Sequence, residues 1–520
     1  MRNQSKLKPA YDYIVIGSGA SGAIIAGELS KTGADVLVVE SGGEDVGPTI
    51  SNPNIWFYNV GGPLDWALPI VPVPQLNNRP FNMALGRVLG GGSSVNAMVW
   101  TRGTARDYDG WERQGAKGWA FNDVLPVFKA QEDWEGGANQ WRGANGPVHI
   151  RRPNNPHPTA SAFLEAARQM GFPTVDDMNG PMRPGAGYIN MNIAPDGSRV
   201  SSARVFLRPN LGRPNLTLRL NTHVTRVLFR GDRASGVELV SGDVAQTIGA
   251  TREVILAAGT IHSAKVLMLS GVGDATELRK WGIAPVANLR GVGQNLQDHV
   301  LVSGVVYQYK NKVVERPADS NGVEAEIHLS SGVDDHPTDI SLVLEQFPIA
   351  APEAAARFAA PPKEGFTIAP ALTHPTSRGQ VRLGSANWRD APVIEPNYLA
   401  TDHDLDAIVK AIEVARELGR QSAFDRMRDA EVVPGPQAGS RQDLIDLART
   451  GSASFGHAVG TAKIGTDVDA VVDSKLRVHG LRGLRVADAS VMPSIISGPG
   501  TNAASYMIGG RAAQFITADL

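Results

Sequence analysis

Residues 13–22 read YIVIGSGASG, and this stretch decides the fold of the first part of the chain. Its apolar start predicts a buried strand, which passes directly into the glycine pattern G-x-G-x-x-G. Residues 23–33 (AIIAGELSKTG) predict a helix, and residues 35–40 (DVLVVE) predict a second strand. A strand, a glycine loop, a helix and a strand in this order predict a Rossmann-type dinucleotide-binding unit.

Each glycine of this loop has its own expected role, and an acidic residue completes the motif. Gly17 allows the tight turn, Gly19 lets the backbone approach a pyrophosphate, and Gly22 lets the helix pack closely on the strand. The helix N-terminus then offers unpaired N–H groups to the phosphates. Glu40 ends the second strand, where its carboxylate is expected to bind a ribose and would repel the 2′-phosphate of NADP. The motif alone does not distinguish FAD from NAD.

The composition excludes several classes of function. The chain has 520 residues, a net charge of −2 and 42% hydrophobic residues, which gives no general attraction for nucleic acid or anionic membranes. It has no cysteine, which excludes disulfides, thiolate metal sites and a cysteine nucleophile. No apolar run approaches the roughly 18 residues of a membrane span, and no apolar signal-peptide segment precedes residue 13. These features predict a cytoplasmic protein without a membrane span.

Further along the chain, the residue pattern predicts both strands and helices. Residues 220–229 (LNTHVTRVLF) alternate between apolar and polar side chains and predict a half-buried strand. Residues 252–259 (REVILAAG) predict a buried strand, and apolar residues at helical spacing predict a helix over 404–420. Residues 310–337 and 351–363 are richer in Pro, charge and Ala, so we expect surface loops or short helices there.

The 57 glycines gather in separate short segments. In GRVLGGGSSVN (86–96), three glycines and two serines form a loop that can lie flat against a planar or anionic ligand. The other notable segments are GTIHSAKVLMLSGVG (259–273), GVGQNLQDH (291–299), GHAVGTAKIG (456–465), LRVADASVMP (484–493) and SGPGTNAASYMIGGRAA (497–513). Folding is expected to bring these points of close backbone approach together.

With these motifs the chain resembles the glucose-methanol-choline (GMC) oxidoreductases, a family of FAD-dependent alcohol oxidases and dehydrogenases. The resemblance extends from Tyr13 to Ala513. Residues 86–96 match the first signature of the family, and residues 259–273 match the second. Three positions depart from residues common in the family without removing a catalytic group: Ala264, Ala462 and Gly500.

The resemblance implies a mixed α/β (α+β) fold. A Rossmann-like FAD-binding domain is expected beside a substrate domain built on an antiparallel sheet with helices. The FAD-binding domain is expected to be discontinuous and to comprise residues 11–150, 215–305 and 460–520. The substrate-binding domain is expected to comprise residues 151–214 and 306–459.

The resemblance also implies which residues bind the cofactor. The segment from Arg87 to Asn96 is expected to run along the flavin, with Val224 at the adenine end. The full expected set is Gly17, Gly19, Gly22, Glu40, Arg87, Gly91, Ser93, Asn96, Val224, Asp488 and Ala489. Some members attach the flavin covalently through a histidine in the first signature region. Because this chain has no His between residues 44 and 148, we expect non-covalent FAD.

Oxidation of an alcohol requires a base for the hydroxyl proton and a donor that orients the oxygen, while FAD takes the hydride at N5. Histidine suits the role of base because its pKa lies near 6.5. His457 matches the catalytic histidine of the family, and Asn502 matches its second active-site residue, whose amide can donate a hydrogen bond. His262, His299 and His374 are expected to be structural.

Other chemistry finds little support in the sequence. No pair of histidines has zincin spacing and no G-x-S-x-G motif occurs, so neither a metal site nor a hydrolase is expected. Phe347 is a candidate to face the flavin, and Trp66 and Trp100 are candidates for a pocket entrance, although each also suits the core. A nicotinamide dehydrogenase would have no use for the segments 86–96 and 259–273.

The function expected from these residues is FAD-dependent oxidation of a small primary alcohol to the aldehyde, with His457 as the base. Molecular oxygen or another molecule would accept the electrons, so an oxidase and a dehydrogenase are both open. The alternative is a flavin-containing lyase on the same scaffold, similar to the hydroxynitrile lyases of the family, which uses the base without net redox chemistry. A flavin-bearing binding module is disfavoured because His457 and Asn502 are both present.

Overall fold

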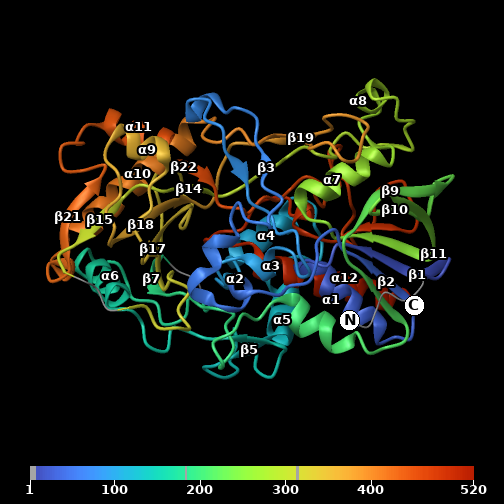
Figure 1. The fold of residues 1–520 in the computed structure, drawn as a ribbon, viewed down its shortest axis with the longest axis horizontal. Helices are drawn as coiled ribbons and strands as arrows, with labels where there is room; N and C mark the ends of the chain where they lie inside the picture. The colour runs from blue at the N-terminus through green and yellow to red at the C-terminus, as the bar shows by residue number, and fades with distance from the viewer. Residues whose placement is uncertain (1–6, 182–183, 312–314) are drawn as a thin grey trace.

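The structure is a computed structural model that describes residues 7–181, 184–311 and 315–520. Two large sheets lie at opposite ends of the molecule, with helices and loops between them (Figure 1). Among the described residues, no helix is both long and apolar enough to cross a membrane. The chain has the mixed α/β fold expected from its motifs.

The first sheet has seven strands and grows from the glycine-loop unit. β1 (Ala10–Ile16) pairs in parallel with β2 (Val36–Val39) because α1 (Ala20–Ser30) carries the chain back across the sheet. Every residue of β2 is buried, as expected for a strand covered on both faces. β8 (Leu216–Arg219) extends the parallel sheet beyond β2.

Distant segments of the sequence complete this sheet. β11 (Val244–Leu256) pairs in parallel with β1 on its other side, and β23 (Leu484–Val486) pairs in parallel with the end of β11. β9 (Thr222–Arg230) and β10 (Arg233–Ser241) add an antiparallel meander at the edge, at the right of Figure 1.

Two helices from other parts of the chain pack against α1 and β9. α7 (Thr260–Leu269) begins directly after β11, and α12 (Asn502–Ala518) lies along α1 near the end of the chain. The contact between α1 and α12 is close, because a Cβ added at Gly509 would lie 2.7 Å from Cα of Ser21. The hydroxyl of Ser21 also donates to the carbonyl of Ser505.

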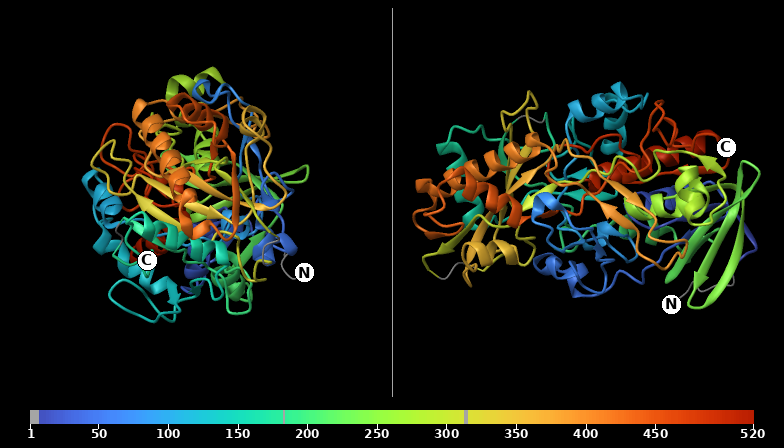
Figure 2. Two further views of the ribbon diagram at one scale, coloured as in Figure 1. Left: turned by 90° about the vertical axis from the view of Figure 1, so that its left-hand side faces the viewer. Right: turned by 90° about the horizontal axis from the view of Figure 1, so that it is seen from above.

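The second sheet has eight strands, and all its pairings are antiparallel. Its central path runs β21-β15-β18-β17-β16-β7, and β14 joins β18 to β22. The strands are β7 (Gly185–Tyr188), β14 (Val300–Val302), β15 (Val306–Tyr309), β16 (Ala325–Leu329), β17 (Ile340–Glu345), β18 (Gly365–Leu372), β21 (Arg428–Val433) and β22 (Ser452–Ser454). α10 (Asp402–Arg420) and α11 (Arg441–Gly451) pack against it (Figure 2).

Shorter elements connect the two sheets. The helices are α2 (Pro48–Ser51), α3 (Gly92–Val95), α4 (Ala105–Arg113), α5 (Phe121–Gln131), α6 (Pro158–Gln169), α8 (Ala275–Lys280) and α9 (Pro352–Arg357). The short strands are β3 (Leu68–Pro69), β4 (Asn82–Met83), β5 (Glu132–Trp134), β6 (Val148–Ile150), β12 (Val272–Gly273), β13 (Ala287–Asn288), β19 (Gln380–Arg382) and β20 (Val393–Glu395). Short helices of other types are η1 (Pro53–Asn59), η2 (Pro74–Leu76), η3 (Ala203–Leu207), η4 (Arg208–Asn210), η5 (Ser422–Phe424) and η6 (Ala489–Val491).

Most of the elements predicted from residue patterns are confirmed. The strands expected at 220–229 and 252–259 are β9 and the end of β11, and the helix expected over 404–420 is α10. The expectation of surface loops or short helices over 310–337 is wrong at β16, a strand whose residues are all buried. The polar residues of this strand suggested a surface position, but in the structure they are buried.

The domain boundaries stay a prediction. The first sheet takes its strands from residues 10–39, 216–256 and 484–486. The second sheet takes its strands from residues between 185 and 454. β14 falls within the range 215–305 that was expected for the FAD-binding domain, and it pairs in the second sheet.

Candidate active site

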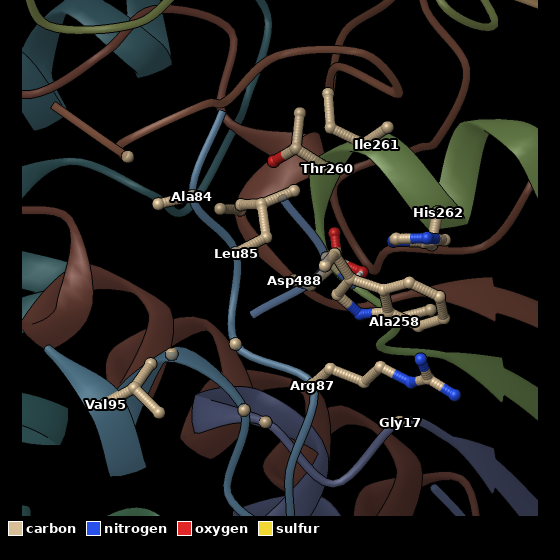
Figure 3. Close-up of a pocket in the computed structure, with 18 of the residues that line it drawn as sticks. Gly17, Ala84, Leu85, Arg87, Val95, Ala258, Thr260, Ile261, His262 and Asp488 are labelled. Atoms are coloured by element: carbon tan, nitrogen blue, oxygen red, sulfur yellow. Dashed lines mark hydrogen bonds between the residues drawn. The ribbon is translucent and has the colours of Figure 1, made fainter. Parts of the chain in front are cut away.

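A cavity of about 680 Å³ lies between the two sheets and is lined from both of them. One end is formed by the glycine loop after β1 and by the segment 84–97, which passes close to it. Figure 3 shows Gly17, Arg87, His262 and Asp488 around this end. The glycine-rich segments that are far apart in the sequence therefore meet at one place.

The three glycines of the loop do different things. Gly17 has a φ of +96°, and a Cβ there would lie 2.3 Å from the carbonyl oxygen of Ala257. A Cβ at Gly22 would lie 2.1 Å from the carbonyl oxygen of Gly17, so α1 reaches its place only without that atom. A Cβ at Gly19 would meet no protein atom within 4 Å, and Gly19 lines the cavity. The first and third glycines therefore serve packing, and the second leaves space for a ligand.

The N-terminus of α1 has the properties of an anion site. Within the described part of the chain, no side chain caps this end of the helix, so its first N–H groups have no side-chain acceptor there. The helix dipole places partial positive charge at the same point. A pyrophosphate above Gly19 would satisfy these groups, so the loop fits a dinucleotide such as FAD.

Glu40 is tied to the glycine loop by the protein itself. Its Oε2 accepts hydrogen bonds from the backbone N–H of Ser18 at 3.0 Å and from the Ser18 hydroxyl at 2.7 Å. Its Oε1 accepts one from the N–H of Gly42 at 2.8 Å. Burial raises the pKa of Glu40 despite these hydrogen bonds. The carboxylate therefore holds the loop in shape, and Oε1 keeps capacity for a further donor from the cavity.

Ten of the eleven residues expected to bind the cofactor line the cavity: Gly17, Gly19, Glu40, Arg87, Gly91, Ser93, Asn96, Val224, Asp488 and Ala489. The remaining one, Gly22, lies beneath the loop as described above. The Arg87 guanidinium lies over the ring of Trp66, 4.8 Å from its centroid. Asp488 accepts hydrogen bonds from the N–H of Gly259 and the hydroxyl of Ser263, so it anchors the start of α7.

His457 and Asn502 line the same cavity, on segments that are 45 residues apart in the sequence. Burial lowers the pKa of His457 to about 4, so its imidazole is neutral at pH 7 and able to accept a proton. Asn502 is the first residue of α12, and its Nδ2 is buried without a hydrogen-bond partner. Among the described residues, a neutral imidazole and an unpaired donor thus line one cavity.

The other histidines singled out from the sequence have distinct surroundings. Nδ1 of His299 lies 3.1 Å from Nδ1 of His457, which the sequence alone did not indicate. His262 lines the cavity and packs on Trp66, with ring centroids 4.3 Å apart, and burial lowers its pKa to about 3. His374 stacks on His336 with ring centroids 4.2 Å apart.

Sequence reasoning also missed an acidic residue of the cavity. Glu345 ends β17 and lines the cavity, and its Oε2 is buried without a hydrogen-bond partner among the residues that the structure describes. Burial raises its pKa to about 8. A titratable group with so strongly shifted a pKa in a cavity is a candidate for a functional role.

Only one of the three aromatic candidates lines the cavity. Trp66 lines the cavity. Trp100 is 1% exposed and donates from its indole to Glu132 at 2.8 Å, so it belongs to the core. Phe347 lies beyond the end of β17 and packs against Phe57, with ring centroids 5.5 Å apart.

Among the described residues, two clusters of metal-ligand residue types lie outside the cavity: Asp107 with His336 and His374, and Asp334 with Asp339 and His403. Single ligand atoms of Asp107, His336 and His374 all lie within 4.8 Å of one another. Asp107 already accepts hydrogen bonds from Ser497 and from Thr104. The absence of a metal site therefore stays a prediction.

Comparison with known proteins identifies the family. A family model described as GMC oxidoreductase matches residues 11–301, and a second one with the same description matches residues 375–509. An oxygen-dependent choline dehydrogenase of Brucella suis is 38% identical, covering 97% of this chain and 95% of that protein. The mitochondrial choline dehydrogenase of Homo sapiens is 36% identical, covering 98% of this chain and 90% of that protein.

Solved structures agree with this result. Pyridoxine 4-oxidase from Mesorbium loti has a TM-score of 0.91 and 30% identity, covering 97% of this chain and 98% of that one. An FAD-dependent oxidoreductase from Chaetomium thermophilum has a TM-score of 0.88 and 25% identity, covering 98% and 99%. The chain therefore belongs to the GMC oxidoreductases, flavoprotein enzymes that act on CH–OH groups.

Proposed function

We propose that this protein binds FAD non-covalently and oxidises a small primary alcohol to the aldehyde, with His457 as the base. The observation that carries the proposal is that a neutral His457 and the unpaired amide of Asn502 line the cavity that runs to the glycine loop. FAD, when bound, supplies the acceptor for the hydride at its N5 atom.

Asn502 and His457 supply the two remaining functions, orientation of the alcohol oxygen and removal of its proton. Nδ2 of Asn502 donates a hydrogen bond to the oxygen of the alcohol and orients it. Nε2 of His457 accepts the hydroxyl proton, because a neutral imidazole has one N–H and one lone pair, and its Nδ1 faces His299. As the proton leaves, negative charge develops on the oxygen. This charge makes the carbon that bears the oxygen a better hydride donor. The two residues thus act on the same substrate atom.

Glu345 supplies the argument for the substrate class. Two curated relatives are named choline dehydrogenases, and choline is a primary alcohol that carries a positive charge. A buried carboxyl without a hydrogen-bond partner is costly alone, and a cationic group in the cavity would compensate it. We therefore propose a small cationic alcohol such as choline as the first substrate to test.

Non-covalent binding rests on the residues near the first signature segment. The cavity-lining stretch 84–97 contains no histidine, so the linkage used by some family members has no partner there. A cytoplasmic location is likewise part of the proposal. It differs from the location in the name of the human relative, which places that protein in mitochondria.

The proposal is tested by an anaerobic screen of alcohols for bleaching of the flavin absorbance, followed by admission of air. Bleaching by a primary alcohol, with formation of the aldehyde, supports oxidation. Recovery of the colour in air identifies oxygen as an acceptor, and its absence points to another acceptor. Cleavage of a hydroxynitrile without bleaching would overturn the proposal in favour of the lyase.

A further inference from the structure

His299 is placed directly behind the base. It ends the segment GVGQNLQDH (291–299) and is 0% exposed. Its Nδ1 lies 3.1 Å from Nδ1 of His457, and its Nε2 lies 3.0 Å from the carbonyl oxygen of Ile496. Both ring nitrogens of His299 therefore have a protein partner, and one of these partners is the base itself.

The hydrogen-bond partners determine where the protons lie. A backbone carbonyl only accepts, so Nε2 of His299 carries a hydrogen and donates it to Ile496. The carbonyl of Thr373 also interacts with the ring and, like that of Ile496, favours a ring N–H. Burial, followed by the nearby His457, lowers the pKa of His299 well below its ordinary value, so the ring is neutral. A neutral ring with hydrogen on Nε2 has a lone pair on Nδ1.

This arrangement determines the tautomer of His457. Facing a lone pair at 3.1 Å, Nδ1 of His457 must carry a hydrogen and donate it. Because burial also keeps His457 neutral, its Nε2 then has no hydrogen and presents a lone pair to the substrate. The opposite tautomer would place a hydrogen on Nε2, where it cannot accept the proton of an alcohol.

We propose that His299 is a positioning residue that holds His457 in the tautomer able to act as a base. This inference rests on the proposed function, in which His457 is that base. His299 also supports the protonated form of His457, because the Nδ1–H of an imidazolium donates more strongly to the same lone pair. The role resembles that of the residue that orients the histidine in hydrolytic triads, with a neutral acceptor in place of a carboxylate.

Several other groups surround this pair and enter the interpretation of pH profiles. The carboxylate of Asp298 accepts the backbone N–H of His457 and the hydroxyl of Tyr398. His374 lies close enough to His299 to lower its pKa further, and Glu345 lines the same cavity as His457. The ring of Phe455 packs on His457 with centroids 4.7 Å apart.

Two variants of the FAD-loaded enzyme separate an acceptor role from a packing role. His299→Leu fills the space without an acceptor, whereas the amide oxygen of His299→Asn can replace the Nδ1 lone pair. His149→Asn is the matched control, because His149 pairs with Asp133 and neither residue lines the cavity. Anaerobic stopped-flow reduction with a bleaching alcohol, from pH 5 to pH 9, gives the limiting rate and the substrate affinity separately.

We expect the limiting rate of His299→Leu to fall about 10- to 100-fold, as for loss of a hydrogen bond to a charged group, with little change in substrate affinity. His299→Asn should recover much of the rate, and His149→Asn should match the wild type. Equal rates for His299→Leu and the wild type would overturn the proposal, as would equal losses in His299→Leu and His299→Asn.

A second measurement does not depend on turnover. The ¹⁵N shifts of labelled histidine distinguish the two neutral tautomers, and His457→Asn identifies the signal of His457. We expect hydrogen on Nδ1 in the wild type and a shift toward Nε2 in His299→Leu. Hydrogen on Nε2 in the wild type would overturn the proposal. If instead His457→Ala reduces normally, the proposed function fails while the tautomer result stands.

Discussion

The backbone N–H of His457 donates to Oδ1 of Asp298 at 2.8 Å, so the residue before His299 holds the backbone that carries the base. The other oxygen, Oδ2, accepts hydrogen bonds from the hydroxyls of Tyr398 at 2.6 Å and Ser454 at 2.5 Å. One buried carboxylate therefore joins three segments behind the cavity. In the short segment QDH, Asp298 therefore binds the backbone of His457, and His299 faces its ring.

Replacing Asp298 by Asn should weaken these hydrogen bonds to His457, Tyr398 and Ser454. An amide has one acceptor oxygen and one donor group, so at least one of the three donors would lose its partner. We expect Asp298→Asn to lower the free energy of unfolding by about 1–3 kcal/mol and to slow flavin reduction. Denaturant unfolding of the FAD-loaded enzyme checks this, with the exposed Asp243→Asn as control. Equal stability of the two variants would contradict the assignment.

The rate of flavin reduction by an uncharged alcohol should rise with pH and then level off. Burial lowers the pKa of His457 to about 4, and below that value its lone pair is occupied by a proton. Burial raises the pKa of Asp298 to about 6, so the carboxylate of Asp298 becomes protonated at a higher pH than His457 does. We therefore expect the rate to decline below about pH 6 and to be level from pH 7 upward. A rate profile with a single ionisation near pH 6.5, unchanged in Asp298→Asn, would show that burial does not lower the pKa of His457.

Substitutions in the glycine loop should separate cofactor binding from folding. Gly19 has a φ of −64°, which any residue adopts, and its Cβ direction is free of protein atoms. Gly19→Val should therefore fold with the stability of the apo wild type and fail to bind FAD. Gly22→Ala should destabilise the protein itself, because its Cβ would lie 2.1 Å from the carbonyl oxygen of Gly17.

Thermal unfolding and flavin content of both variants check this pair, with Gly212→Ala as the control, because a Cβ at Gly212 meets nothing within 4 Å. A yellow Gly19→Val protein would place the phosphates elsewhere. Wild-type stability of Gly22→Ala would contradict the close packing of α1.

Glu345→Gln tests the substrate class. Gln keeps the size of Glu345 and cannot ionise, so it should weaken binding of choline about 10-fold or more and leave an uncharged alcohol unaffected. In the wild type, choline should bind more tightly as pH rises through about 8, because the carboxylate form then predominates. Titration of both enzymes across pH checks both statements. Equal losses for the charged and uncharged alcohols would contradict a charge-based role.

The sequence predicts well those features that are encoded locally. The β1–α1–β2 unit follows from residues 13–40, because an apolar run, three spaced glycines and a second apolar run lie within one short stretch. His457 and Asn502 were assigned through motif resemblance, and the structure brings both to one cavity.

The features that were missed depend on long-range contacts. β16 contains Glu326 and His328, whose polarity suggested a surface segment, but β16 lies between β7 and β17 and both side chains are buried. His299 meets His457 across 158 residues of sequence, and nothing local marks that contact. Glu345 ends a mostly apolar strand, and the strand end becomes a cavity wall only where the distant glycine-rich segments approach it.

The central claim is that His457 removes the hydroxyl proton while Asn502 orients the oxygen. Loss of a positioned base typically costs about 10²–10⁴-fold. His457→Ala should therefore slow flavin reduction to that extent while the protein stays folded and yellow. Asn502→Ala should cost less, because one hydrogen bond is lost and the base remains.

The most direct test is anaerobic stopped-flow reduction of the wild type, His457→Ala and Asn502→Ala by the same alcohol across pH. The account predicts a large loss of rate in His457→Ala together with loss of the low-pH ionisation. Reduction of His457→Ala within a few-fold of the wild type, with the same pH profile, would contradict it.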